Sequence, residues 1–313
     1  MTETIAYSPA MSRHVTVELS MCGQNALLAA RIGDWTWETV SHQTKFDVLS
    51  AHTPYGERTY LVYSYFHIQA GALLHPLGLS IGNELDVHSQ AFDSGGGTVS
   101  VLHRIAPTDI ASATPTEPLD PAEPETWPQS ERMYVRTINN WVRRGRDGNP
   151  TLATATPDGF TTAPLPALPD GRRFRAVLSH ARRTSSLAGL LQPSLQPIGA
   201  EHTTYYRIDP SRDLNAAGIV YFAAYFSFID SALLALWRRD GGSDAGFLNR
   251  RVLDQKICYY ANATPDTTLA ITIRLLKDPA RSREEVADVL IRDRADGRLL
   301  AVSVIRLAAR RVP

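Results

Sequence analysis

The stretch DLNAAGIVYFAAYFSFID, from Asp213 to Asp230, decides the fold class of this chain. Its apolar character continues beyond Asp230, so that Ala216–Leu236 holds 21 residues with Asp230 as the single charge. That length is enough to cross a bilayer. However, tyrosines and serines lie inside the segment and not only at its ends, where a membrane span would place aromatic residues. The sequence therefore favours a fully buried helix of a soluble core, over Leu214–Trp237.

The segments around this helix occur in the same order in both halves of the chain. An extended segment precedes a helical stretch in each half, and alternating apolar residues then predict three or four strands. In the first half these are His14–Leu19, the helix Gln24–Ile32, and the strands Thr59–Ile68, Glu84–Phe92, Thr98–Ile105 and Ser130–Arg144, the last running into polar turns. In the second half they are Thr203–Ile208, the apolar helix, and the strands Lys256–Ala261, Leu269–Leu276, Glu285–Asp293 and Leu299–Leu307. A duplicated α+β unit is the economical explanation.

Proline-rich segments indicate where the two units meet. Pro107–Pro128 is acidic and holds six prolines, which predicts a surface loop. We expect an N-terminal domain over residues 1–145 that contains this loop, a linker over 146–174 and a C-terminal domain over 175–313.

The repeated unit resembles the hot-dog arrangement, in which a strongly curved antiparallel sheet wraps around one long apolar helix. The resemblance rests on Asp213–Asp230, where a polar, glycine-containing turn leads into a Tyr-Phe-x-x-Tyr run, and on Tyr259–Leu269 with its Pro-Asp turn. With SRHVTVELS from Ser12 and GDWTWE from Gly33, the chain is similar to the acyltransferase/decarboxylases of leinamycin-type polyketide clusters. The resemblance implies an α+β double hot-dog: two curved antiparallel sheets, each wrapped on a central apolar helix.

Composition and charge exclude several classes of protein. The 32 basic residues balance 32 acidic ones, which removes the basic excess that nucleic-acid binding needs. Arginine clusters remain, among them Arg172, Arg173 and Arg175. The excess of arginine over lysine indicates a coding bias first, with recognition of acidic groups as the alternative. Two cysteines are too few for a disulfide framework, and no secretory signal is visible, so we expect a cytoplasmic protein and no membrane association.

Residues for acid–base or metal chemistry are scarce in the sequence. The nine histidines form no pair with zinc-ligand spacing, and there is no Gly-x-Ser-x-Gly motif, so we expect no metal site and no serine hydrolase. Cys22, near the start of the first helix, is expected to be a small core residue. Hot-dog enzymes of many kinds use a carboxylate on the central helix. The candidates are Asp230, interpreted as paired or facing the surface, and Glu38, expected to be exposed in a polar turn. The lack of a convincing base disfavours hydrolysis and dehydration.

Decarboxylation of a malonyl thioester needs little acid–base help, because its main requirement is a set of hydrogen-bond donors for the developing enolate. The start of the second helix would supply such donors, and Asn215 lies at this predicted start. Asn215 is therefore a candidate oxyanion donor, a helix N-cap, or both. Gly218 would permit close approach of a ligand, and we expect Gly218 and Tyr221 to contact substrate.

The family resemblance implies a tyrosine in the first unit that is itself acylated. The candidates are Tyr60, Tyr63 and Tyr65, and strand alternation predicts that Tyr63 and Tyr65 share one face while Tyr60 lies on the other. We favour Tyr63 and keep Tyr60 as the alternative. A phenol also needs a nearby positive charge or hydrogen-bond donors to act as a nucleophile.

The resemblance thus implies an enzyme that decarboxylates methylmalonyl-CoA, or a related malonyl thioester, and transfers the acyl group to an acyl carrier protein in polyketide biosynthesis. Coenzyme A and phosphopantetheine thioesters are expected as substrates, with no separate cofactor. A homodimer through sheet edges stays open. The alternatives are a hot-dog thioesterase or dehydratase acting on acyl thioesters, and a non-catalytic protein that binds them.

Overall fold

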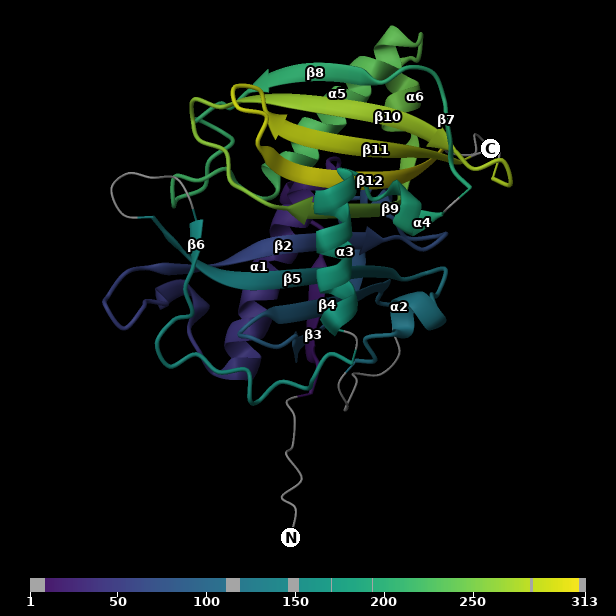
Figure 1. Ribbon diagram of the computed structural model, residues 1–313. Helices are drawn as coiled ribbons and strands as arrows, with labels where there is room; N and C mark the ends of the chain where they lie inside the picture. Colours follow the sequence, from purple (N-terminus) through teal and green to yellow (C-terminus); the bar gives the residue numbers. More distant parts are fainter. Residues whose placement is uncertain are drawn as a thin grey trace.

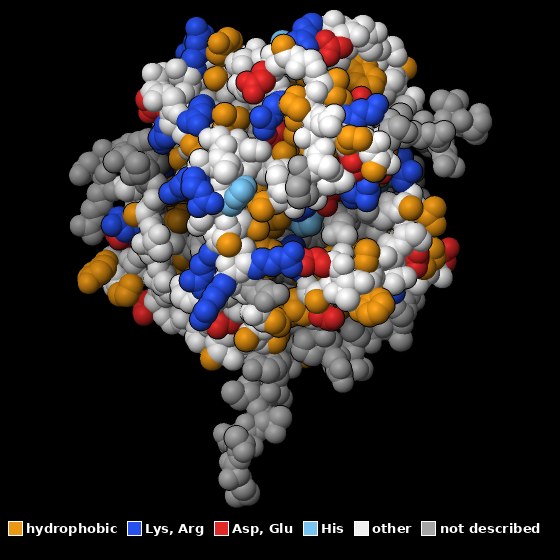
Figure 2. Space-filling view, turned by 45° about the vertical axis from the view of Figure 1, so that its right-hand side comes forward, with side chains coloured by type: hydrophobic (Ala, Val, Ile, Leu, Met, Phe, Trp, Pro, Cys, Tyr) orange, Lys and Arg blue, Asp and Glu red, His pale blue; other side chains and the backbone are white. Residues whose placement is uncertain are grey.

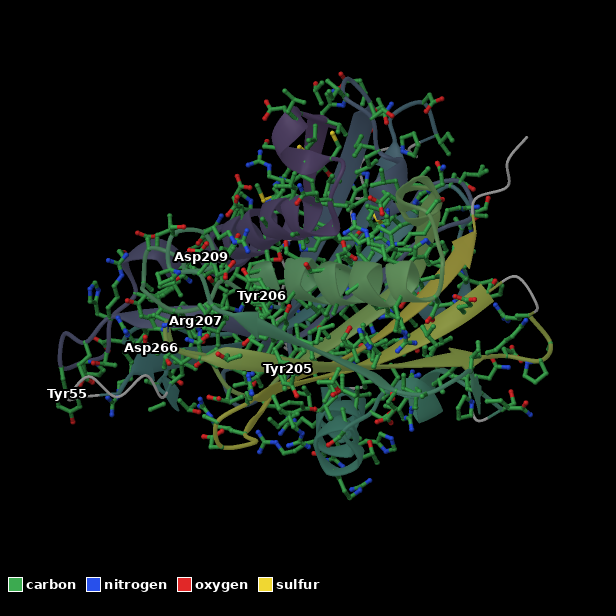
Figure 3. All side chains as sticks on the ribbon, turned by 90° about the horizontal axis from the view of Figure 1, so that it is seen from above. Tyr55, Tyr205, Tyr206, Arg207, Asp209 and Asp266 are labelled. Carbon is green, nitrogen blue, oxygen red and sulfur yellow. The ribbon has the colours of Figure 1, made fainter. Side chains whose placement is uncertain are left out.

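One continuous antiparallel sheet forms the centre of the molecule. The computed structural model describes residues 9–110, 119–145, 152–169, 171–192, 194–281 and 284–309. Within this part of the chain, the sheet has twelve strands in the order β1-β3-β4-β5-β2-β9-β12-β11-β10-β7, with β6 paired to β5 and β8 to β10. Helices α1 and α5 pack on one face of the sheet, and α3 crosses the opposite face (Figures 1 and 3). This arrangement confirms the predicted double hot-dog.

The two halves contribute equivalent elements in the same order. The first half consists of β1 (Met11–Thr16), α1 (Asn25–Thr44), β2 (Thr59–Gln69), β3 (Glu84–Asp93), β4 (Val99–Pro107), α2 (Glu123–Thr126), β5 (Met133–Arg144) and β6 (Leu152–Thr154). The second consists of β8 (His202–Arg207), α5 (Ala224–Arg239), α6 (Asp244–Leu248), β9 (Arg250–Tyr259), β10 (Thr268–Lys277), β11 (Glu284–Asp293) and β12 (Leu299–Ala309). Between them lie α3 (Gly171–Thr184), α4 (Ala188–Leu191) and β7 (Gln196–Pro197). The predicted repeat is therefore present.

Strands β2 and β9 join the two halves along a short seam. They pair only from Tyr65 to Gln69 on β2, opposite Asp254 to Cys258 on β9, whereas β2 pairs with β5 along its whole length. The register of β2 against β5 shifts between Tyr63 and Tyr65, which is a β-bulge at Ser64. Because the β2–β9 pairing ends at this bulge, the first part of β2 lies free of β9.

Alternation along each strand divides the apolar side chains between two cores. The larger core fills the space between the sheet and helices α1 and α5 and includes residues of both halves, such as Phe66 and Phe226. A second core lies under α3 and contains Phe174 and Ala181. Figure 3 shows the same alternation at β8, with Tyr206 on the α5 side and Tyr205 on the other.

The two predicted central helices are real, but their bounds were wrong. The first continues to Thr44, because residues beyond Gly33 recur at helical spacing on one long buried face of α1, in which threonines and a glutamine join the apolar side chains. Glu38, predicted in a polar turn, therefore lies on this helix, where it is exposed and pairs with Arg13 at 2.9 Å. The second helix begins at Ala224 and not at Leu214, since the residues before it form a turn described below. Among the described residues, no helix is long and apolar enough to cross a membrane.

The domain bounds remain a prediction, although one helix lies across the expected end of the linker. Helix α3 begins at Gly171, inside the expected linker, and continues into the expected C-terminal domain. The proline-rich loop lies partly outside the described residues, at 111–118. Its remainder packs on the sheet: Leu119 is buried, and Glu123 accepts hydrogen bonds from Arg104, Arg132 and Tyr134. This end of the segment lies on the surface, as predicted, and is anchored there by these contacts.

Candidate active site

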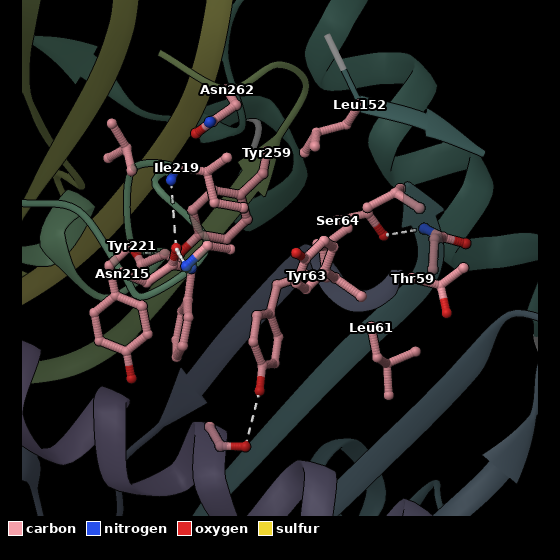
Figure 4. A pocket seen from close by; sticks show the side chains of 18 of the residues that line it. Thr59, Leu61, Tyr63, Ser64, Leu152, Asn215, Ile219, Tyr221, Tyr259 and Asn262 are labelled. Carbon is pink, nitrogen blue, oxygen red and sulfur yellow. Dashed lines mark hydrogen bonds between the residues drawn. The ribbon is translucent and has the colours of Figure 1, made fainter. Parts of the chain in front are cut away.

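A cavity of about 1040 Å³ lies where β2 and β9 separate. Its lining comes from the middle of α1, the first part of β2, the turn before α5 and the residues that follow β9 (Figure 4). Residues from both faces of the sheet take part, since Tyr63 belongs to the core under α1 and α5, while Arg182 is on α3. Four of the five predicted site residues, Tyr60, Tyr63, Asn215 and Tyr221, line this one cavity.

Tyr63 lies deep in the cavity wall. Only 7% of the residue is exposed, its hydroxyl donates a hydrogen bond to the Gly33 carbonyl of α1 at 3.0 Å, and its ring lies 4.1 Å from that of Phe222 (Figure 4). Burial raises the pKa of Tyr63 well above the usual value of a phenol. The hydroxyl is therefore protonated at neutral pH and would need a proton acceptor in order to act as a nucleophile.

The other two tyrosines of the strand lie elsewhere. Tyr60 also lines the cavity, on the opposite face of β2 from Tyr63, as alternation predicts. The prediction that Tyr63 and Tyr65 share a face was wrong, because the bulge at Ser64 inserts one residue and turns Tyr65 to the α3 side. There Tyr65 is buried near Phe174 and does not line the cavity.

Asn215 lines the cavity but does not cap α5, which begins nine residues further on, so the N-cap interpretation was wrong. Its side-chain oxygen accepts hydrogen bonds from the backbone N–H groups of Ala217 and Ile219, at 3.0 and 3.4 Å (Figure 4). Such local bonds compete with helix formation, and Gly218 adopts a φ of +67°, which only glycine does easily. The turn therefore delays the helix. No described residue accepts a hydrogen bond from the Asn215 side-chain amide, which keeps its donors for a ligand.

The start of α5 does not offer the free backbone donors that we expected. The N–H groups of Ala224, Tyr225 and Phe226 are bonded to carbonyls of the preceding turn at 3.0 to 3.3 Å. The positive end of the helix dipole still faces the cavity, because Tyr225 in the first turn lines it. The direct hydrogen-bond donors for an oxyanion are therefore side chains, with Asn215 the one predicted from the sequence.

Gly218 and Tyr221 were both expected to contact substrate. Tyr221 lines the cavity, and burial together with the nearby carboxylate of Asp34 raises its pKa to about 12. Gly218 is not among the lining residues; a side chain there would point toward Arg144, whose guanidinium lies 3.6 Å from the Cβ position. The geometry gives Gly218 a role in forming the turn, and its contact with substrate stays a prediction.

Asp34 is a site residue that the sequence analysis missed. It follows Gly33 on α1, lines the cavity, and its charge acts on the hydroxyls of both Tyr63 and Tyr221. Partial burial raises the pKa of Asp34 above its usual value. The signal was present in GDWTWE, but the segment was interpreted as a turn after a shorter helix. The sequence analysis found no convincing base on this helix because it ended the helix at Ile32, before Asp34.

Aromatic side chains make most of the inner wall. Phe222, Tyr225 and Tyr259 line the cavity together with Tyr63, and the Tyr259 hydroxyl donates to the Phe222 carbonyl at 3.2 Å. Burial raises the pKa of both Tyr225 and Tyr259. Among the described residues that line the cavity, Asp34 is the one acid, whereas Arg58, Arg182 and Arg298 are basic. The cavity thus combines an apolar interior with a rim that carries the exposed residues Asp34, Arg58 and Arg182.

The start of α1 contacts the middle of α5 through polar side chains. Asp230, in the middle of α5, pairs with Arg250 at 2.7 Å and accepts a hydrogen bond from Asn25 at 3.4 Å. This confirms the prediction of a paired carboxylate. Burial raises the pKa of Asp230, and the Arg250 charge opposes that shift. The start of α1 thus meets the middle of α5 through an ion pair, whereas the start of α5 meets the middle of α1 at the cavity.

In the described parts of the chain, no group of three or more histidine, cysteine or acidic side chains is placed to hold a metal ion. Cys22 lies before α1, partly exposed, with its thiol directed to the Glu18 carbonyl at 3.5 Å. It is not among the residues that line the cavity.

Comparison with known proteins decides the family. The LnmK N-terminal Hot Dog Fold domain matches residues 12–189, more than half of the 313-residue chain. The chain belongs to this family. The matched part of this LnmK-family protein contains Tyr60, Tyr63, Asp34 and α3, whereas Asn215 and Tyr221 lie beyond it.

Solved structures agree on the fold of the LnmK-family chain over nearly its whole length. It is similar to a putative oleoyl thioesterase from Lactobacillus plantarum, with 13% identity, a TM-score of 0.58, and coverage of 98% of this chain and 99% of that one. It is also similar to the 12:0-ACP thioesterase from Umbellularia californica, with 12% identity, a TM-score of 0.60, and coverage of 96% and 94%. No curated protein matches the sequence. At these identities the structures show the double hot-dog fold alone.

Proposed function

We propose that this protein is an acyl-thioester enzyme that takes the acyl group of methylmalonyl-CoA, or a related malonyl thioester, decarboxylates it, and transfers it to an acyl carrier protein. The observation that carries the proposal is the place of Tyr63, a buried hydroxyl in the wall of the cavity, within the part of the chain that the family model matches. Tyr60, on the same strand and in the same cavity, is the alternative acyl acceptor.

In the loading step, the Tyr63 oxygen attacks the thioester carbonyl, the carbon–sulfur bond breaks, and coenzyme A leaves as its thiol with the phenolic proton. Asp34 is the acidic residue of the cavity whose charge acts on this hydroxyl, so it is the candidate carrier of that proton. In the transfer step, the carrier thiol attacks the tyrosyl ester, the oxygen–carbon bond breaks, and the phenol regains a proton.

Decarboxylation breaks the bond between C2 and the carboxylate, releases CO₂ and leaves an enolate that takes up a proton at C2. The aromatic wall favours this step because it solvates the substrate carboxylate poorly. Asn215 keeps side-chain donors for the enolate oxygen, and a buried donor of this kind typically contributes ~10²–10³-fold in rate. The exposed arginines at the rim suit the phosphates of coenzyme A.

A second candidate function is thioester hydrolysis, which Asp34 favours. Asp34 is an exposed residue of the central helix that lines the cavity and can activate water there, and partial desolvation raises its pKa, which suits a general base. The two functions differ in the fate of the acyl group: it is retained on the protein in the first and released as free acid in the second.

The deciding experiment incubates the pure protein with methylmalonyl-CoA and a holo acyl carrier domain and then weighs both proteins by mass spectrometry. A propionyl adduct on the enzyme and then on the carrier supports the proposal. Release of free acid that is abolished in Asp34→Asn supports hydrolysis instead. An unchanged thioester would contradict both and leave a non-catalytic binding protein.

A further inference from the structure

We propose that the arginine face of α3 is the docking surface for the acidic carrier domain, and that the carrier's arm enters the cavity past the end of this helix. The inference rests on the proposed function and adds the surface that the partner recognises. Helix α3 has the sequence GRRFRAVLSHARRT, with five arginines and no acidic residue. A chain whose formal net charge is zero thus concentrates positive charge on one helix.

The helix is anchored by one side and displays the other. Phe174 and Ala181 are buried against the sheet, with Val177 and Leu178 partly buried beside them. All five arginines are exposed; they are Arg172, Arg173, Arg175, Arg182 and Arg183. Helix α3 crosses the outer face of the sheet (Figure 1), and in Figure 2 blue side chains surround a hollow on the face turned toward the viewer.

The internal contacts of these arginines leave charge available for a partner. Arg173 pairs with Glu125, Arg175 donates to the Ser94 carbonyl at 2.9 Å, and Arg182 lies over the Tyr260 ring at 4.9 Å. In the described part of the chain, neither Arg172 nor Arg183 forms an ion pair or hydrogen bond through its side chain. Unpaired guanidinium groups on a rigid helix fit the carboxylates of an acidic protein surface.

The surface adjoins the cavity, which is why a carrier and not any acidic protein fits it. Arg182 and Tyr260, which stack on each other, both line the cavity on the α3 side, together with Ser64 at the bulge. The opening between β2 and β9 leads from there toward Tyr63. A carrier seated on α3 would therefore hold its thiol arm at the side from which Tyr63 can be reached through the sheet.

The test is the charge-reversed variant Arg172→Glu/Arg183→Glu, because these two side chains have no ion-pair or hydrogen-bond partner among the described residues whose loss would disturb the fold. The matched control is Arg207→Glu/Arg294→Glu, which makes the same change of net charge at exposed positions on β8 and after β11. We expect the α3 variant to raise KM for a holo acyl carrier domain of a polyketide synthase about tenfold or more. Acyl loading from the CoA thioester and transfer to free pantetheine should remain at the wild-type rate in both variants.

Binding of the fluorescently labelled carrier domain, measured by anisotropy, gives a readout that does not depend on chemistry. Loss of binding in the α3 variant, and weaker wild-type binding as the salt concentration rises, would support the surface even if no acyl group were ever loaded. Equal binding by the α3 variant and the control, or no binding by the wild type, would overturn it. Failure of the wild type to load any acyl group would instead overturn the proposed function.

Discussion

Replacing Tyr63 by phenylalanine separates the chemical role of its hydroxyl from its structural one. The ring contact with Phe222 at 4.1 Å is kept, and only the hydrogen bond to the Gly33 carbonyl is lost. Such a bond contributes about 1 kcal/mol to the free energy of unfolding. With an unfolding entropy of ~2.1 cal/mol/K per residue, that loss lowers the melting temperature of a chain of 313 residues by only about 1.5 °C.

The loading reaction should respond far more strongly, because Tyr63 is the acyl acceptor in the proposed function. We expect self-acylation by methylmalonyl-CoA, followed by mass spectrometry of the intact protein, to fall by roughly 10³-fold or more in Tyr63→Phe. Tyr65→Phe is the matched control, since it removes a buried hydroxyl from the same strand outside the cavity. Undiminished acylation of Tyr63→Phe, with loss in Tyr60→Phe, would show that the acceptor is on the opposite face of β2.

Three further predictions follow from the site and the core. A methyl group at Gly33 would lie 2.6 Å from the Phe222 ring and 3.2 Å from the Tyr63 hydroxyl, so Gly33→Ala should displace these side chains. A displacement of ~1 Å costs roughly 10²-fold in rate, and we expect loading to slow by that factor. Loading at the wild-type rate in stopped-flow measurements would refute this. Asn215→Ala should slow single-turnover decarboxylation ~10²-fold while leaving CoA-thioester binding intact, and an unchanged rate would limit Asn215 to its turn. Burial lowers the pKa of His103 from 6.5 to about 3, so the folded state keeps this histidine neutral where the unfolded state would protonate it. The free energy of unfolding should therefore fall by about 1.4 kcal/mol per pH unit as the pH drops below 6.5. Urea unfolding of His103→Gln should lack this contribution, and an unchanged pH dependence would refute it.

The sequence predicted the repeated unit and most strands because their signals are local. Strands are marked by alternating apolar residues and turns by glycines, and both signals lie within a few consecutive residues. In the turn at 93–97, for example, three glycines adopt positive φ. The helix bounds were harder to predict from the sequence. Gly33 and Asp34 look like a helix end in isolation, and only the packing of the residues after them on the sheet shows that α1 continues.

The site was partly predictable for the same reason. Tyr63 was found through the family resemblance and Asn215 through the predicted start of the second helix, and the structure brings both to one cavity. The bulge at Ser64 has no marker in the sequence, so alternation placed Tyr65 on the wrong face. Asp34 depends on how α1 approaches the turn before α5, a contact between residues nearly two hundred positions apart that no local pattern records.

The ion pair of Asp230 with Arg250 bears on how many acyl groups one chain can hold. A symmetric pair of hot-dog subunits would carry two equivalent pockets, one where each helix start meets the partner helix. In this chain the start of α5 meets α1 at an open cavity, but the start of α1 meets α5 at a closed contact of Asp230, Arg250 and Asn25. The two positions thus differ in this chain: one is an open cavity, and the other is filled by side chains that contact one another. A fully loaded chain should accordingly hold one acyl group and not two.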